Sequence, residues 1–282
     1  MKSIWRIALS VCLLVALTGT TPAQFASTVI GYDRGGCTTD YDDPNAVIGA
    51  PDRMTPDWPS GTAPVTIFNP PWGADTNDWG ADQVFSFGSG GFIEVMFDAP
   101  VEDDPCNPFG IDLIVFGNAG FIGADWPATT CTDPAAMFGN DAGTIEVSQN
   151  GAAWYSVTPL ADALFPTTGW ADAAHSVPSD FLRPVNPSLT LSNFDGLTEA
   201  QALTLYTGSG GGTGVDLAAT GLAWIRYVRV TNNNPASAEL DVDIDAFADV
   251  AAVPEPGMIA LVAAALALGA RRRKGRETPF MP

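Results

Sequence analysis

The sequence predicts an all-β protein built as a single β-sandwich with long loops. Glycine and proline are abundant, with 29 Gly and 23 Pro among 282 residues, and this favours strands joined by many turns over helices. Short apolar runs and alternating segments recur between the turn clusters. About 230 residues lie between two terminal targeting segments, which is enough for one substantial core.

Strands are predicted in nine segments of this central part. They are residues 28–32, 65–68, 83–87, 91–97, 113–116, 144–148, 154–157, 223–231 and 239–247. Ile93, Val95 and Phe97 form one wholly apolar face at a period of two, as expected for a half-buried strand. Residues 113–116 form a continuous apolar run, which suits a strand buried on both faces.

The connections are predicted to be turns and loops. Asn150-Gly151 separates segments 144–148 and 154–157, and Asn-Gly is a strong hairpin signal. Residues 45–52 indicate a loop with a tight turn. Residues 160–214 indicate irregular loops with one short helix near residues 199–205, ending in a flexible Gly-rich loop at 208–214.

The N-terminus has the three parts of a secretory signal peptide. Lys2 and Arg6 precede an apolar run over residues 7–17, and Thr21-Pro22-Ala23 offers small residues for cleavage before Gln24. We therefore expect residues 1–23 to be a signal peptide and residues 24–252 to be the exported domain.

The C-terminus carries a helix-breaking turn, an apolar run and a basic cluster. Val253, Pro254, Glu255 and Pro256 form the turn, because each proline fixes its own φ and disfavours helix before it. Residues 257–270 contain no charge and would be roughly 21 Å long as a helix, against about 30 Å of hydrocarbon. Arg271, Arg272, Arg273 and Lys274 follow, where a stop-transfer anchor places positive charge.

This tail resembles the PEP-CTERM sorting segment of bacterial exported proteins. The resemblance covers about residues 253–276 and leaves residues 277–282 as a short extension. It implies sorting by an exosortase, a transient membrane anchor near the C-terminus, and final placement at the cell surface or in the extracellular matrix.

The exported domain is strongly acidic. Seven of the 12 basic residues lie in the two targeting segments, together with two of the 32 acidic ones, which leaves 5 basic against 30 acidic side chains in residues 24–252. Such a surface repels nucleic acid and anionic lipid. It suits solubility, divalent cations and a carbohydrate-rich exterior.

Three cysteines remain after removal of the signal peptide. We expect a disulfide between Cys106 and Cys131, because both lie in turn-rich segments that flank one strand region and because export permits disulfides. Cys37 would then be the free thiol, although spacing alone leaves the pairing open. The chain has no Cys/His spacing typical of zinc.

Several motifs of the central part resemble an exported cell-surface module of the discoidin or galactose-binding jelly-roll type. They are Ala46–Asp52, Phe87–Ile93, Gly110–Phe116, Ile145–Trp154, Tyr227–Val230 and Asp243–Ala246, in this order along the chain. The resemblance implies a jelly-roll-like sandwich and says little about the ligand.

Asp241, Asp243 and Asp245 are the predicted metal ligands. Alternation along a strand places them on one face, and carboxylates on one face suit Ca²⁺. The alternative is a solvated polar face opposite Val242 and Ile244. Asp40, Asp42 and Asp43 could form a second acidic site, and residues 102–104 a third, but we interpret both groups as solvated loops.

No catalytic residue is predicted. His175 is the only histidine and has no motif around it. The aromatic residues Trp58, Trp72, Trp79 and Trp126 lie in Pro/Gly/Asp-rich loops, where they would either pack in the core or stack on sugar rings.

The sequence therefore favours a non-enzymatic binding or structural protein associated with Ca²⁺ and extracellular polysaccharide. The alternative hypothesis is a secreted glycan-active hydrolase with two catalytic carboxylates, which would need a deep cleft beside a close carboxylate pair.

Overall fold

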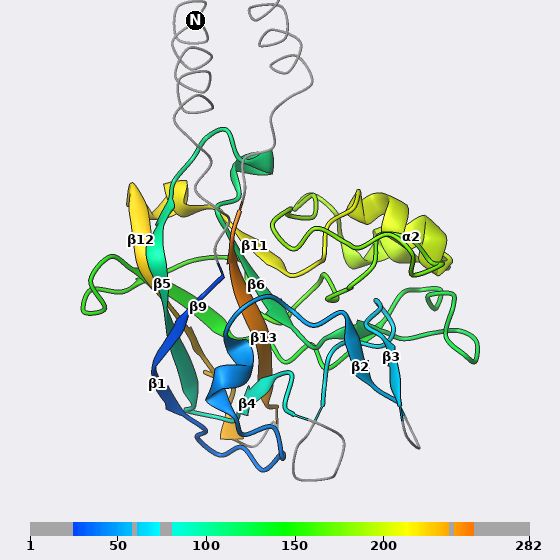
Figure 1. The fold of residues 1–282 in the computed structure, drawn as a ribbon, viewed down its shortest axis with the longest axis horizontal. Coiled ribbons are helices and arrows are strands. Elements are labelled where there is room, and N and C mark those ends of the chain that lie inside the picture. Colours follow the sequence, from blue (N-terminus) through cyan, green and yellow to red (C-terminus); the bar gives the residue numbers. More distant parts are fainter. Residues whose placement is uncertain (1–24, 58–60, 74–80, 237–239, 251–282) are drawn as a thin grey trace, which may run out of the picture. The chain divides into compact units, whose positions relative to one another are not determined.

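Two antiparallel β-sheets form the framework of the protein, and the structure is all-β as predicted (Figure 1). The computed structural model describes residues 25–57, 61–73, 81–236 and 240–250. In spatial order, the first sheet contains β1 (Thr28–Asp33), β5 (Phe92–Glu102), β12 (Trp224–Thr231), β9 (Thr144–Ser148) and β10 (Tyr155–Ser156). The second contains β11 (Thr213–Val215), β6 (Leu113–Gly117), β13 (Val242–Asp249) and β4 (Phe85–Phe87).

Smaller elements lie in the connections. Two short pairs are β2 (Met54–Pro56) with β3 (Thr62–Pro64), and β7 (Gly120–Phe121) with β8 (Met137–Phe138). The helical elements are η1 (Pro44–Val47), η3 (Pro108–Gly110), η4 (Leu191–Phe194), α2 (Glu199–Tyr206) and η5 (Leu217–Thr220). The described residues belong to one compact unit, Ala23–Ala251.

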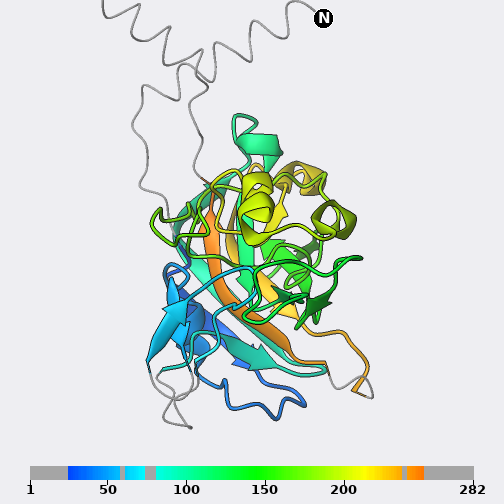
Figure 2. The same ribbon diagram turned by 90° about the vertical axis from the view of Figure 1, so that its right-hand side faces the viewer.

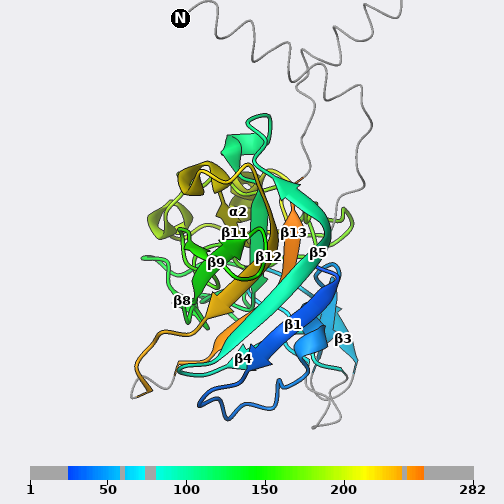
Figure 3. The same ribbon diagram turned by 90° about the vertical axis from the view of Figure 1, so that its left-hand side faces the viewer.

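The main core lies between the two sheets. The alternation predicted for the strand at residues 91–97 is present, since Ile93, Val95 and Phe97 are all fully buried. They pack in one cluster with side chains of the second sheet, such as Phe85 and Phe247. Figure 3 shows the strands of the first sheet crossing in front of β13. Burial of apolar surface between the sheets is thus the main stabilising contribution to the fold.

The second sheet is buried on its other face as well. Ile114 and Phe116 of β6 point away from the main core and pack with Phe181, which comes from the long connection between β10 and β11. In Figure 2 this connection and α2 lie on the side of the molecule facing the viewer. The continuous apolar run of β6 is explained by this position, because both of its faces need apolar side chains.

A second small core lies beneath α2. The helix begins at a capping box in which Thr198 Oγ1 accepts from the Gln201 N–H and Gln201 Oε1 accepts from the Thr198 N–H. Its buried side chains, Ala202, Leu203 and Tyr206, pack in a cluster with Phe121 and Phe194. The short helix predicted near residues 199–205 is confirmed.

Two local predictions are wrong. Residues 65–68 form a turn, with Thr66 Oγ1 accepting from the N–H groups of Phe68 and Asn69, and the neighbouring strand β3 ends before them. The Gly-rich segment 208–214 is mostly buried, because Gly210 and Gly212 leave no room for a side chain beside Phe181 and Phe116. By contrast, the predicted hairpin around Asn150-Gly151 is confirmed, because β9 pairs with β10 and Val147 lies opposite Tyr155.

Strand β13 also departs from simple alternation. Val242, Ile244 and Phe247 all face the main core, which two-residue spacing alone does not allow. A register shift against β6 between Ile244 and Ala246 adds the extra residue. All but the last residue of the strand are buried, so its aspartates do not form a solvated face.

The predicted signal peptide (1–23), sorting tail (253–276) and extension (277–282) lie outside the described residues. In the part of the chain that is described, no helix combines the length and apolarity needed to cross a bilayer.

Candidate metal centre

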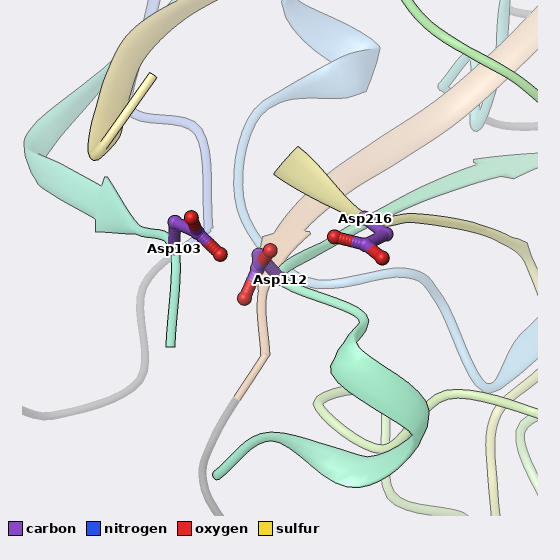
Figure 4. A group of neighbouring side chains, drawn as sticks. All are labelled: Asp103, Asp112 and Asp216. Atoms are coloured by element: carbon purple, nitrogen blue, oxygen red, sulfur yellow. The ribbon is translucent and has the colours of Figure 1, made fainter. Parts of the chain in front are cut away.

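Three carboxylates from different parts of the chain meet at one end of the sandwich (Figure 4). Asp103 follows β5, Asp112 precedes β6, and Asp216 follows β11. One oxygen of each lies within 4.8 Å of the others. The antiparallel pairing of Leu113 with Val215 sets Asp112 beside Asp216, so sheet register brings together residues 104 positions apart.

Asp112 is the best-anchored member of this group. Its side chain is fully buried, with Oδ1 accepting from the Asp104 N–H at 3.0 Å and from Asn107 Nδ2 at 2.9 Å. Oδ2 accepts from the Leu217 N–H at 3.0 Å. These donors fix the orientation of the carboxylate, so its two oxygens are held in place before any ligand arrives.

Asp216 is oriented by the helix turn that follows it. Its Oδ1 accepts from the Ala218 N–H at 2.8 Å, which makes Asp216 the N-cap of η5. Capping uses one oxygen of the carboxylate and leaves the other for a ligand.

The negative charges of this group are not neutralised by basic side chains among the described residues. Burial raises the pKa of Asp112 to about 6, and the charge of Asp103 adds to the effect. Burial together with Asp112 and Glu102 raises the pKa of Asp249, at the end of β13, to about 7. Among the described residues, none of these acids forms an ion pair with a basic side chain. Either protons or a cation would lower the repulsion.

Hard oxygen ligands of this kind suit Ca²⁺, which accepts carboxylates together with carbonyl or water oxygens. Asp103, Asp112 and Asp216 would hold the ion, with Asp249 and Glu102 adding negative charge nearby. Asp103 belongs to the acidic group 102–104, for which the sequence predicted a solvated loop. Asp112 and Asp216 were missed, although Asp112 stands directly before the apolar run predicted at residues 113–116.

The predicted ligands Asp241, Asp243 and Asp245 do not form one set. Asp243 Oδ1 accepts from the Ser86 hydroxyl, and Asp241 Oδ2 lies 3.3 Å from Cys37 Sγ. Asp245 is buried. Burial raises its pKa, and the charge of Asp52 raises it further. The prediction assumed strict alternation in an exposed strand, whereas β13 is irregular and buried.

The other acidic loop is exposed, as interpreted from the sequence. Asp40, Asp42 and Asp43 are exposed, and Asp43 caps η1 by accepting from the Asn45 N–H at 2.8 Å. The N–H groups of Asp42 and Asp43 donate to Asp82. These side chains thus shape a turn.

The predicted disulfide between Cys106 and Cys131 is wrong. Cys131 carries a free thiol that is fully buried in the core beneath α2, and Cys37 is also free. The β-bridge of Gly123 with Cys131 directs this residue inward, so a sequence argument based on turn-rich flanks could not place it.

His175 lies in a turn near the start of α2. Its Nε2 is 3.5 Å from Glu199 Oε1, and Asp172 closes the turn by accepting from the N–H groups of Ser176 and Val177. The histidine therefore links two loops of the long connection.

Trp126 is the most exposed large apolar side chain described, with 95% of its surface accessible. Its loop is braced by Asp125, whose Oδ1 accepts from the N–H groups of Thr129 at 2.8 Å and Thr130 at 3.0 Å. Trp72 is half-buried, and Trp58 and Trp79 lie outside the described residues.

A small cavity lies beside β6 and β11, lined by Val115, Gly117, Ala119, Asp162, Ala163, Phe165, Pro166, Gly212 and Thr213. Its volume is about 10 Å³, close to the minimum that holds one water molecule. A sugar ring does not fit there.

The comparisons with known proteins add no assignment. No protein-family model and no curated protein matches this chain.

Proposed function

We propose that this protein is an exported, non-catalytic β-sandwich that binds extracellular polysaccharide at the cell surface or in the matrix. The observation that carries the proposal is Trp126, a tryptophan with 95% of its surface accessible on an internally braced loop. Exposing a large aromatic ring forgoes the burial that usually stabilises it. A flat aromatic face held on a fixed loop is suited to stacking on a sugar ring.

The finer fold assignment belongs to the same proposal. Sheets of five and four antiparallel strands around one core support a jelly-roll-like sandwich of the discoidin or galactose-binding type. In such sandwiches the loops at the ends of the strands carry the ligand contacts.

The best-supported Ca²⁺ site consists of Asp103, Asp112 and Asp216. Three converging oxygens without a basic partner support a divalent ion that holds the ends of β5, β6 and β11 together. The ion's role here would be structural, in keeping with the predicted association with Ca²⁺.

Export and sorting rest on the terminal sequences. The signal peptide at residues 1–23 would direct export, and an exosortase would act near Pro254-Glu255-Pro256, with Arg271–Lys274 stopping transfer meanwhile. Replacing Pro254, Glu255 and Pro256 by alanine should leave the protein in the membrane fraction. Unchanged release would contradict exosortase sorting.

The glycan proposal is tested by a glycan-array screen of the purified protein, followed by affinity measurements on Trp126→Ala. We expect roughly tenfold weaker binding, equivalent to about 1.4 kcal/mol. Tyr155→Ala is the matched control, because Tyr155 is another exposed aromatic residue (43% accessible) outside this loop. Unchanged affinity of Trp126→Ala, or no glycan bound by the wild type, would refute the proposal.

The alternative, a glycan hydrolase, has no supporting observation of this strength. The charge of Asp243 raises the pKa of Asp162, but the cavity lined by Asp162 has room for about one water molecule. Two catalytic carboxylates need a sugar between them.

A further inference from the structure

Two buried oxygen atoms beside β6 have no hydrogen-bond donor. They are Oδ2 of Asp162 and Oδ1 of Asn118. Asp162 exposes only 3% of its surface, and its other oxygen accepts from the Ala119 N–H at 3.0 Å. An unpaired buried acceptor destabilises the folded protein, and it does so more strongly when it is charged. A bound cation or a proton would remove this cost.

Both side chains face the same partner, Asp243 of β13. The Asn118 amide donates to the Asp243 carboxylate, which also accepts from the Ser86 hydroxyl. After burial, the charge of Asp243 is the main cause that raises the pKa of Asp162. Asn118, which follows β6, and Asp162, in the long connection, thus both interact with Asp243 of β13.

Because residue 117 is a glycine, the Asp162 carboxylate can lie close to β13. A Cβ at this position would overlap Oδ1 of Asp162 and lie 2.8 Å from the carbonyl oxygen of Asp243. The missing side chain lets the Asp162 carboxylate lie against the backbone of β13. The same Gly117 and Asp162 line the cavity of about 10 Å³, so the orphaned carboxylate adjoins space for one small occupant.

The surrounding charges are all negative. Asp141 lies close enough to raise the pKa of both Asp162 and Asp243, and Asp241 raises that of Asp243 and Asp141. Arg34 contacts the backbone of Ser86, but its guanidinium donates to the Ser86 carbonyl, the Thr39 carbonyl and Cys37 Sγ. Among the described residues, neither Asp162 nor Asp243 has an ion-pair partner.

We propose that Asp162, Asp243 and the Asn118 amide oxygen bind one Ca²⁺ ion on the buried face of the second sheet. The ligands are hard oxygens, carboxylate and amide, as Ca²⁺ prefers. Mg²⁺ fits less well, because it retains several waters and the adjoining cavity holds about one. The ion would hold the connection after β10, through Asp162, against the second sheet, through Asp243. This site shares no residue with the Asp103, Asp112 and Asp216 group and does not depend on glycan binding.

The test counts Ca²⁺ per chain in the full-length protein after chelator treatment and titration with Ca²⁺ alone, by calorimetry. Asp162→Asn is expected to lose one bound ion relative to the wild type. The loss should appear equally in an Asp112→Asn background, which separates this site from the one at the sandwich end. An unchanged ion count in Asp162→Asn would overturn the proposal.

Asn118→Asp provides a second measurement should Asp162→Asn fail to fold. The carboxylate that replaces the amide increases repulsion in chelator and exchanges a neutral ligand for a charged one in Ca²⁺, so the gap in Tm between the two conditions should widen. The competing explanation is a proton shared by Asp162 and Asp243. In that case Asp162→Asn would stabilise the protein equally with and without Ca²⁺, and Asn118→Asp would leave the gap unchanged. Either result would refute the cation.

Discussion

Oδ2 of Asp112 accepts a hydrogen bond from the Leu217 N–H at 3.0 Å, joining two residues 105 positions apart. The bond ties the start of β6 to the first turn of η5, directly beside the N-cap Asp216. Asp112 therefore holds the end of the sandwich together whether or not an ion is bound. The same buried carboxylate interacts with the charges of Asp103 and Asp249.

Calcium should stabilise this end of the protein. Adding millimolar Ca²⁺ to chelator-treated wild type is expected to raise Tm, and Asp216→Asn should reduce that rise because it removes one ligand charge. Differential scanning calorimetry checks this. Asp57→Asn, an exposed acid elsewhere, is the matched control and should respond like the wild type. An equal rise in Asp216→Asn would argue against the Asp103, Asp112 and Asp216 group.

Stability without metal should fall as pH rises. The pKa values of Asp112 and Asp249 are raised by burial from 3.8 to about 6 and about 7. The folded chain therefore binds more protons than the unfolded chain between about pH 4 and pH 7, and folding is favoured at the acidic end of this window. In chelator we expect Tm to be higher at pH 4.5 than at pH 7.5, on the order of 5–10 °C. A Tm that increases over this range would contradict the expectation.

Asp245→Asn should stabilise the protein at neutral pH. Asp245 is buried, its Oδ2 has no hydrogen-bond donor, and burial raises its pKa well above the ordinary value. An amide of the same shape removes the cost of the charge. The gain, about 1 kcal/mol or more, should be larger at pH 7.5 than at pH 4.5, because the raised pKa of Asp245 costs more stability the further the pH lies above the ordinary pKa of aspartate. Urea unfolding at both values measures it.

Arg229→Lys should destabilise the first sheet. Arg229 donates from Nε to Glu146 Oε2 at 2.9 Å, forms a second contact of 2.9 Å through its NH2 group, and lies 4.2 Å from the centre of the Trp154 ring. Lysine cannot reproduce the planar guanidinium contacts with both partners. We expect a loss of about 1 kcal/mol in urea unfolding. Arg226→Lys is the control, because Arg226 contacts only backbone carbonyls of β5.

Cys131 should resist alkylation in the native state. Its thiol is buried, and burial raises its pKa to about 11, so little thiolate is present at pH 8. Mass spectrometry after iodoacetamide treatment should find Cys131 modified only in denaturant. Rapid modification of the native protein would show that the core beneath α2 opens readily.

Local patterns of apolar and polar residues predicted many of the strands. Residues 144–148, 113–116 and 223–231 lie within one residue of β9, β6 and β12. The helix predicted near residues 199–205 corresponds to α2, whose capping residues Thr198 and Gln201 are only three positions apart in sequence. Such signals depend on side-chain alternation and near neighbours, which sequence contains directly.

The candidate site could not be read in the same way. Asp112 and Asp216 approach each other only because β6 pairs with β11. The residues next to either aspartate do not predict that pairing. Likewise, the register shift in β13 turns a regular Asp-x-Asp-x-Asp pattern into separate buried environments. Metal ligation needs atoms within a few ångströms, and those distances are set by strand register.

The sequence by itself determined the all-β class, the acidic charge and most of the strands, because composition and periodicity follow from the energetics of single segments. Tertiary structure alone decided which acids converge, that Cys131 is a free thiol in the core, and that Asp162 and Asn118 carry unpaired buried oxygens. The physical reason is that burial and pairing are properties of contacts between segments. The same aspartate is a solvated loop residue or a buried ligand depending on what packs against it.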